Sequence, residues 1–100
     1  ESLPPSARPA PKLDDEELAA ALKAAQAAYQ GENLEAALSA YAPLVEAEQG
    51  LEQVIEALAA IANETDSLDA IELLGDACTR AGRHRDALAA YQRVLQRLDS

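Results

Sequence analysis

Apolar residues recur at three- and four-residue spacing along five segments of the chain, and a glycine or a polar turn follows each of the first four. This spacing places the apolar side chains on one face of an α-helix. It predicts five helices, over residues 15–30, 33–48, 51–62, 68–81 and 85–98. Alternating runs of β-branched and aromatic residues, which are typical of strands, are absent. Because every connection is short, we expect an all-α domain in which consecutive helices lie antiparallel.

The ends of these segments carry helix-capping residues. The run Asp14–Glu17 supplies an N-cap and negative charge at the positive end of the first helix dipole, and Asn33 can cap the second helix. Pro43 lies inside the second helix, where its missing N–H should kink the helix or split it in two. Residues 63–67 are predicted to be the turn before the fourth helix, with the cap of that helix among the last two.

The apolar stripes define a thin expected core. The chain has no Phe, Trp or Met but 24 alanines, so we expect closely packed helices around Leu, Ile and Val side chains. The stripe of the last helix is long, and we expect it to face inward. Its members are Ala87, Leu88, Tyr91, Val94, Leu95 and Leu98. A partner, a second copy or further sequence should cover its outer end, because a terminal repeat helix needs a cap.

The N-terminal segment differs from the rest in composition. Residues 1–13 include Pro4, Pro5, Pro9 and Pro11. Proline has no backbone N–H and favours extended chain. We therefore predict that residues 1–13 are a linker or disordered tail and that residues 14–100 form the helical domain.

Two segments of the chain are related to each other. The run Ala37-Leu-Ser-Ala-Tyr41 matches Ala87-Leu-Ala-Ala-Tyr91, and Gly31 pairs with Gly82 if one residue of slippage is allowed in the turn. Such an internal repeat of two helices is typical of helical-repeat proteins.

The second segment resembles the tetratricopeptide repeat. That family has a Leu-Gly pair in its first helix, a Gly near the turn, an Ala early in the second helix and an aromatic residue four positions later. The matching residues here are Leu74, Gly75, Gly82, Ala87 and Tyr91. Cys78 and Ile71 stand where the family usually has Tyr and Trp. Residues 16–48 match less closely, because Lys23-Ala24 replaces the Leu-Gly pair.

The resemblance implies a short α–α superhelix similar to some bacterial tetratricopeptide-like tails. The helix over residues 51–62 lies between the two hairpins and belongs to neither, so the expected layout is hairpin, single helix, hairpin. The resemblance also implies a groove that binds a protein or peptide. The groove-facing positions are Gln26, Tyr29, Asp69, Glu72, Asp76 and Arg80. Their mostly acidic character does not fit the carboxylate clamp of the chaperone-binding members, in which an Asn stands at the position of Asp76.

The net charge is −10 and is unevenly distributed. Residues 13–78 carry fifteen acids against Lys23 alone, whereas residues 79–97 carry five arginines against Asp86. This balance argues against binding to nucleic acid or to an anionic membrane, which require clusters of Lys and Arg. The plain interpretation is a well-hydrated helical surface. The more specific interpretations are an acidic groove for a basic partner, or head-to-tail contact between copies.

No constellation in the sequence points to catalysis, and we expect no catalytic residue, no cofactor and no metal site. Cys78 and His84 are the only residues of their kinds, and a dyad would need both in contact with a third, orienting group. We expect a buried Cys78 and an exposed His84. A single cysteine, with no signal peptide and no long apolar run, favours a reducing, cytoplasmic location.

Two functions stay open at this point. The first is a non-catalytic protein–protein interaction module that uses the groove of the first and fourth helices to hold a protein or peptide of basic character. The second is a structural self-association domain that joins copies into a homo-oligomer through the exposed face of the last helix and the region of Pro43.

Overall fold

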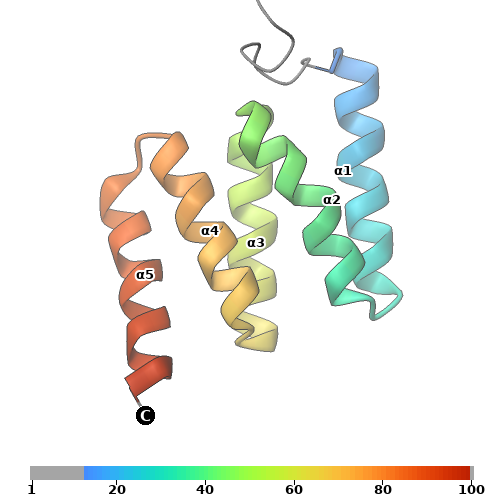
Figure 1. The fold of residues 1–100 in the computed structure, drawn as a ribbon. Helices are drawn as coiled ribbons and strands as arrows, with labels where there is room; N and C mark the ends of the chain where they lie inside the picture. The colour runs from blue at the N-terminus through green and yellow to red at the C-terminus, as the bar shows by residue number, and fades with distance from the viewer. Residues whose placement is uncertain (1–12, 100) are drawn as a thin grey trace, which may run out of the picture.

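The computed structural model describes residues 13–99, which form five α-helices and no strand. The helices are α1 (Asp15–Gln30), α2 (Leu34–Ala47), α3 (Leu51–Thr65), α4 (Leu68–Arg80) and α5 (His84–Asp99). Consecutive helices run in opposite directions (Figure 1). The all-α class and the antiparallel order are therefore confirmed.

The helix starts follow the local capping chemistry. The carboxylate of Asp14 accepts a hydrogen bond from the Glu17 N–H at 2.8 Å, and the Glu17 carboxylate accepts one from the Asp14 N–H at 3.1 Å. This reciprocal capping box fixes the first turn of α1. The side-chain oxygen of Asn33 caps α2 in the predicted way, by accepting from the N–H of Ala36 at 3.1 Å.

The predicted linker overlaps the folded unit by one residue. Residues 1–12 lie outside the described residues, but Leu13 packs against the core. Its N–H donates to Gln49 Oε1 at 2.6 Å, and Gln49 Nε2 donates to its carbonyl at 2.8 Å. Leu13 therefore ties the start of α1 to the loop between α2 and α3.

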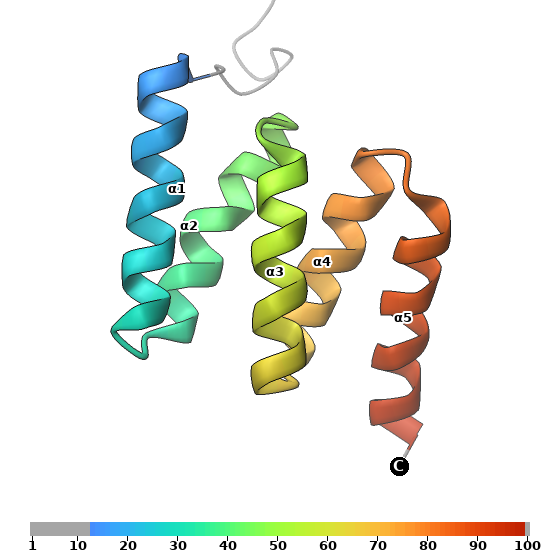
Figure 2. The same ribbon diagram turned by 180° about the vertical axis from the view of Figure 1, so that it is seen from behind.

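The helices are arranged as a flat slab of 52 × 30 × 19 Å. α1 and α3 lie on one side and α2 and α4 on the other, while α5 packs along α4 at the end of the row (Figures 1 and 2). α1 pairs with α2, α3 with α4, and α4 with α5, and α2 also touches α3 and α4. α2 and α4 are therefore the central helices, and α1 and α5 are the outer ones.

α3 lies between the two hairpins in the chain order, as expected, and it packs closely on α4. The predicted end of this helix was wrong. α3 continues through residues 63–65, which were expected in a turn, and it ends where Asp66 adopts a left-handed conformation with φ of 56°. The exposed polar residues 63–65 extend α3 by almost a turn. The helix can end at position 66 because Asp tolerates the left-handed conformation. Ser67 then caps α4.

α2 continues through Pro43, so the predicted split does not occur. Proline removes the N–H that would bond to the carbonyl of Ser39. Both residues lie on the exposed side of α2, where water can donate the hydrogen bond that the Ser39 carbonyl lacks. The opposite side of the same turn carries Leu44 and Val45, which are buried. Packing of this inner face holds the helix together across the proline.

The two hairpin turns have the same hydrogen bonds at an offset of fifty residues (33 to 83, 32 to 82). The N–H of Asn33 bonds to the carbonyl five residues before it at 3.0 Å, and the N–H of Arg83 does the same at 2.8 Å. The left-handed position of the first turn is Glu32, with φ of 61°, and that of the second is Gly82, with φ of 78°. The expected slippage is therefore absent, and the counterpart of Gly82 is Glu32 rather than Gly31.

This equivalence predicts opposite effects of two substitutions. An L-residue in the left-handed region costs about 1 kcal/mol, and glycine avoids that cost. We expect Glu32→Gly to raise the free energy of unfolding by about 0.5–1 kcal/mol and Gly82→Ala to lower it by about 1 kcal/mol. A Cβ at Gly82 would meet no atom within 4 Å, so its cost comes from the backbone alone.

Urea unfolding followed by helical circular dichroism measures both changes. Glu32→Ala is the control, because it removes the carboxylate but keeps a Cβ in the strained conformation. An equal gain from Glu32→Ala and Glu32→Gly would show that charge, and not backbone strain, limits the first turn.

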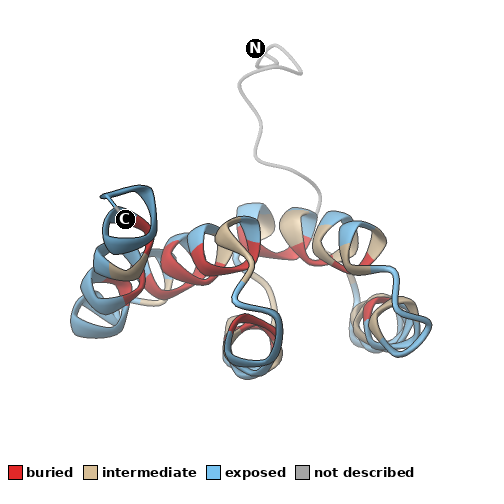
Figure 3. Ribbon diagram, turned by 90° about the horizontal axis from the view of Figure 1, so that it is seen from below, coloured by how far each residue is buried: buried red, intermediate tan, exposed pale blue. Residues whose placement is uncertain are grey.

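The core lies where α2, α3 and α4 meet, and the buried positions line the inner sides of the helices (Figure 3). Its largest fully buried side chains are Tyr41, Leu58, Ile61, Ile71, Val45, Val54 and Cys78. Cys78 is buried, as predicted, and burial raises the pKa of its thiol. His84 is exposed at the start of α5.

The inward orientation predicted for α5 was only partly right. Ala87 and Val94 are buried, but Leu88, Leu95 and Leu98 are 59%, 65% and 67% exposed. The equivalent of Leu95 in the first hairpin, Val45, is only 2% exposed. The difference follows from position: α1, α3 and α4 all lie against α2, whereas α5 packs mainly on α4.

Candidate functional site

An open groove runs between α2 and α4, on the side of the slab away from α1 and α3. Its volume is about 740 Å³, within the range of ligand-binding clefts. The two helices point in the same direction, so their first turns meet at one end of the groove (Figure 1). The residues that line it are Leu34, Glu35, Leu38, Ser39, Ala42, Ser67, Asp69, Glu72, Leu73 and Asp76.

The lining combines an apolar floor with an acidic rim. Leu34, Leu38 and Leu73 are half-buried and pack against the core. Four carboxylates, from Glu35 and from three residues of α4, stand among them, and no Lys or Arg lines the groove. Like charges on one low-dielectric surface add to a common negative potential. The groove is therefore suited to a ligand that is both apolar and positively charged.

The structure brings together three of the residues that the resemblance singled out. Asp69, Glu72 and Asp76 lie at i, i+3 and i+7 on one face of α4, and all three line the groove. Asp76 also accepts a hydrogen bond from the Tyr91 hydroxyl at 2.6 Å, and this bond raises the pKa of Tyr91. Asp76 therefore joins the groove wall to α5, while Asp69 and Glu72 make no side-chain hydrogen bond to another residue of the range 13–99.

Arg80 lies one turn beyond Asp76, at the far end of the groove. Its guanidinium donates to the carbonyl of Glu46 at 3.3 Å and pairs with the Glu48 carboxylate at 3.4 Å. This exposed pair contributes little to stability. It does hold Arg80 against the last turn of α2, where its charge complements the negative end of the α2 dipole.

The two expected residues of α1 do not face this groove. Tyr29 lines a separate hollow of about 490 Å³ with Glu32, Glu64 and Thr65, and Leu34 borders both spaces. The Tyr29 hydroxyl donates to Glu64 at 2.5 Å, which raises the pKa of Tyr29. The smaller hollow is also acidic, because Glu32 and Glu64 line it.

Gln26 is exposed on α1 and lines neither space. α1 and α4 are separated by α2, so they do not form one concave face. The α2 wall of the groove, with Glu35 and Leu38, was absent from the residues named by resemblance. The only sequence signal for this wall was the pairing of an apolar Leu38 with a charged Glu35 one turn earlier. That pattern occurs in most amphipathic helices and does not single out a binding surface.

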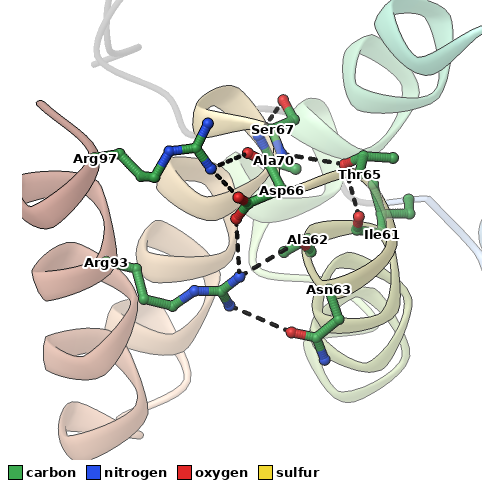
Figure 4. A network of polar contacts seen from close by, with 9 residues as sticks. All are labelled: Ile61, Ala62, Asn63, Thr65, Asp66, Ser67, Ala70, Arg93 and Arg97. Carbon is green, nitrogen blue, oxygen red and sulfur yellow. Dashed lines mark hydrogen bonds and ion pairs between the residues drawn. The ribbon is translucent and has the colours of Figure 1, made fainter. Parts of the chain in front are cut away.

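Two arginines of the basic C-terminal segment, Arg93 and Arg97, contact the end of α3 (Figure 4). Arg97 forms a hydrogen-bonded ion pair with the Asp66 carboxylate and donates to the Asp66 carbonyl at 3.0 Å. Arg93 pairs with the same carboxylate at 3.6 Å and donates to Asn63 at 3.4 Å. Asp66 thus clamps α5 to α3, and this part of the positive charge is balanced within the chain.

Among residues 13–99, no group of three or more His, Cys, Asp or Glu side chains could hold a metal ion. No helix in the same range is long and apolar enough to cross a membrane. No family model matches the chain, and no match was found among the curated proteins or the solved structures. The groove and the exposed surfaces of the helices are therefore the features of this chain that bear on its function.

Proposed function

We propose that the chain is a non-catalytic protein-interaction module of the tetratricopeptide-repeat kind, whose α2–α4 groove binds a basic, amphipathic segment of a protein partner. The observation that carries this proposal is the lining of the groove. Its leucine floor offers apolar contact, and its four carboxylates offer charge, without any base to compete for them.

The shape of the groove favours a short helix as its occupant. The lining on α2 extends from Leu34 to Ala42, which is about 12 Å along a helix axis. A bound helix of two to three turns can place its apolar face on Leu34, Leu38 and Leu73 and its Lys or Arg side chains beside the rim. Burial of the apolar face supplies affinity, while the charges speed association and select against acidic partners.

A synthetic amphipathic Leu/Lys peptide of three to four helical turns tests the proposal. We expect it to bind, and a Leu/Glu peptide of the same pattern not to bind. Glu72→Lys should weaken binding of the basic peptide about fivefold to tenfold, because a groove charge of the wrong sign costs about 1 kcal/mol or more. Fluorescence anisotropy of the labelled peptide, measured at two salt concentrations, gives the dissociation constants.

The matched control is Glu56→Lys. Glu56 is an exposed residue in the middle of α3 and lies outside the groove, so the two variants change the net charge equally. Leu38→Asn tests the apolar floor and should also weaken binding. If Glu56→Lys weakened binding as much as Glu72→Lys, the peptide would be responding to net charge, and the groove would not be its site.

A further inference from the structure

The outer face of α5 carries four large apolar side chains that the other described residues leave partly or mostly exposed. Leu88, Tyr91, Leu95 and Leu98 follow one another at spacings of three, four and three residues, and we call them the α5 stripe. Each is at least 36% exposed. They are the only large hydrophobic residues exposed to this degree in the described part of the chain. A contiguous apolar surface of this kind marks an interaction site.

The internal repeat shows that this face is built for packing. At an offset of fifty residues, Leu88, Tyr91 and Leu95 correspond to positions 38, 41 and 45 of α2. In α2 the equivalent tyrosine and valine are 1% and 2% exposed, because α3 and α4 lie against that helix. The neighbour that follows α2 runs antiparallel to it (Figure 2). α5 carries the same apolar face, and among the five described helices none follows it to cover that face.

The spacing of the stripe is the same in both directions along the helix. A second α5 that runs antiparallel places Leu88 against Leu98 of the other copy and Tyr91 against Leu95 of the other copy. A twofold axis then passes between Tyr91 and Leu95. A surface that matches itself about a twofold axis is the requirement for an isologous dimer.

The charges beside the stripe select this orientation. Arg85, Gln92 and Asp99 lie along the outer edge of the stripe and are exposed, in the order positive, neutral, negative. Antiparallel pairing brings Arg85 of one copy near Asp99 of the other and sets the two Gln92 side chains face to face. Parallel pairing would place like charges together at both ends. The arginines at 93 and 97 point instead toward Asp66 and α3.

We propose that the α5 stripe is a twofold interface through which two copies of this chain associate, with their α5 helices antiparallel. This interface is distinct from the α2–α4 groove and does not depend on the function proposed for it. The partner helix takes the place, beside α5, that α3 takes beside α2. A single helix pair buries a small area, so the dimer forms at micromolar or higher concentration.

Sedimentation analysis over a concentration series tests the association. The wild-type chain should pass from monomer to dimer, and Leu95→Glu should raise the dimer dissociation constant more than about tenfold. Leu95 is exposed in the single chain, so this variant should keep its helical circular dichroism. Gln26→Glu on α1 is the control with the same added charge. A wild-type chain that stays monomeric throughout, or forms larger open-ended assemblies, would overturn the proposal.

Cysteine cross-linking tests the orientation. In the antiparallel pair, Gln92→Cys faces its own copy and should form a disulfide-linked dimer under mild oxidation. Arg85→Cys should not, because its two copies lie about 24 Å apart along the helix axis, beyond the reach of a disulfide. The native Cys78 is buried and does not contribute. Cross-linking of both variants would indicate parallel pairing, and cross-linking of neither would indicate another contact; both results contradict the proposed interface.

Discussion

Replacing Tyr41 with alanine is expected to lower the free energy of unfolding by about 3–5 kcal/mol, as for other large buried aromatic residues. Tyr41 is 1% exposed and lies in the core shared by α2, α3 and α4. Because three helices meet there, the cavity left by the ring cannot close by the movement of one of them. A domain of this size has a total stability of about 5–15 kcal/mol, so the variant should be close to unfolding at physiological temperature.

The internal repeat supplies a matched control. Tyr91 occupies the equivalent position in the second hairpin but is 36% exposed, so Tyr91→Ala should cost no more than about 2 kcal/mol. Urea unfolding of both variants, at several protein concentrations, separates this loss from any contact between copies. Equal losses at the two tyrosines would contradict the central position of α2.

Local features of the fold could be predicted from the sequence because their causes are local. The capping box of α1, the Asn33 cap and the five helical periods each depend on residues within a few positions of one another. The end of α3 was misplaced for the same reason. Residues 63–65 are polar, and nothing in their own composition indicates that the helix continues through them and ends only at Asp66.

The burial of the second hairpin could not be predicted, because it depends on neighbours that are distant in sequence. Leu38 and Leu88 lie in nearly identical runs of five residues, yet Leu38 is half-buried and Leu88 is exposed. The close contact between α3 and α4 likewise depends on packing and not on either helix alone. This contact makes α4 central and leaves α5 at the edge, so the second hairpin does not repeat the environment of the first.

The same limit applies to the groove. The resemblance placed Asp69, Glu72 and Asp76 on the groove side of α4, and these three residues line one space in the structure. The opposite wall comes from α2, which is separated from α4 in sequence by the whole of α3. A parallel contact between non-consecutive helices has no signature in either helix alone. Glu35 and Leu38 could therefore be recognised only in three dimensions.

Gly75→Ala should destabilise the chain by about 1–2 kcal/mol, although alanine is the better helix former. Replacing an interior helical glycine with alanine normally gains about 0.5–1 kcal/mol. A Cβ at this position would lie 2.7 Å from Cε1 of Tyr91, which is too close for a stable contact, and such overpacking costs about 1–3 kcal/mol. The ring cannot turn away freely, because its hydroxyl is bonded to Asp76 at 2.6 Å.

A double-mutant cycle isolates this contact. In a Tyr91→Leu background the ring is gone, and Gly75→Ala should then stabilise the chain by its normal helical gain of about 0.5–1 kcal/mol. The sign of one substitution thus depends on the other, with a coupling of about 2 kcal/mol measured by urea unfolding. If Gly75→Ala had the same effect in both backgrounds, α4 and α5 would not approach each other closely at this crossing. The glycine at position 75 would then not be explained by contact with Tyr91, and the position of the α5 stripe beside α4 would have to be revised.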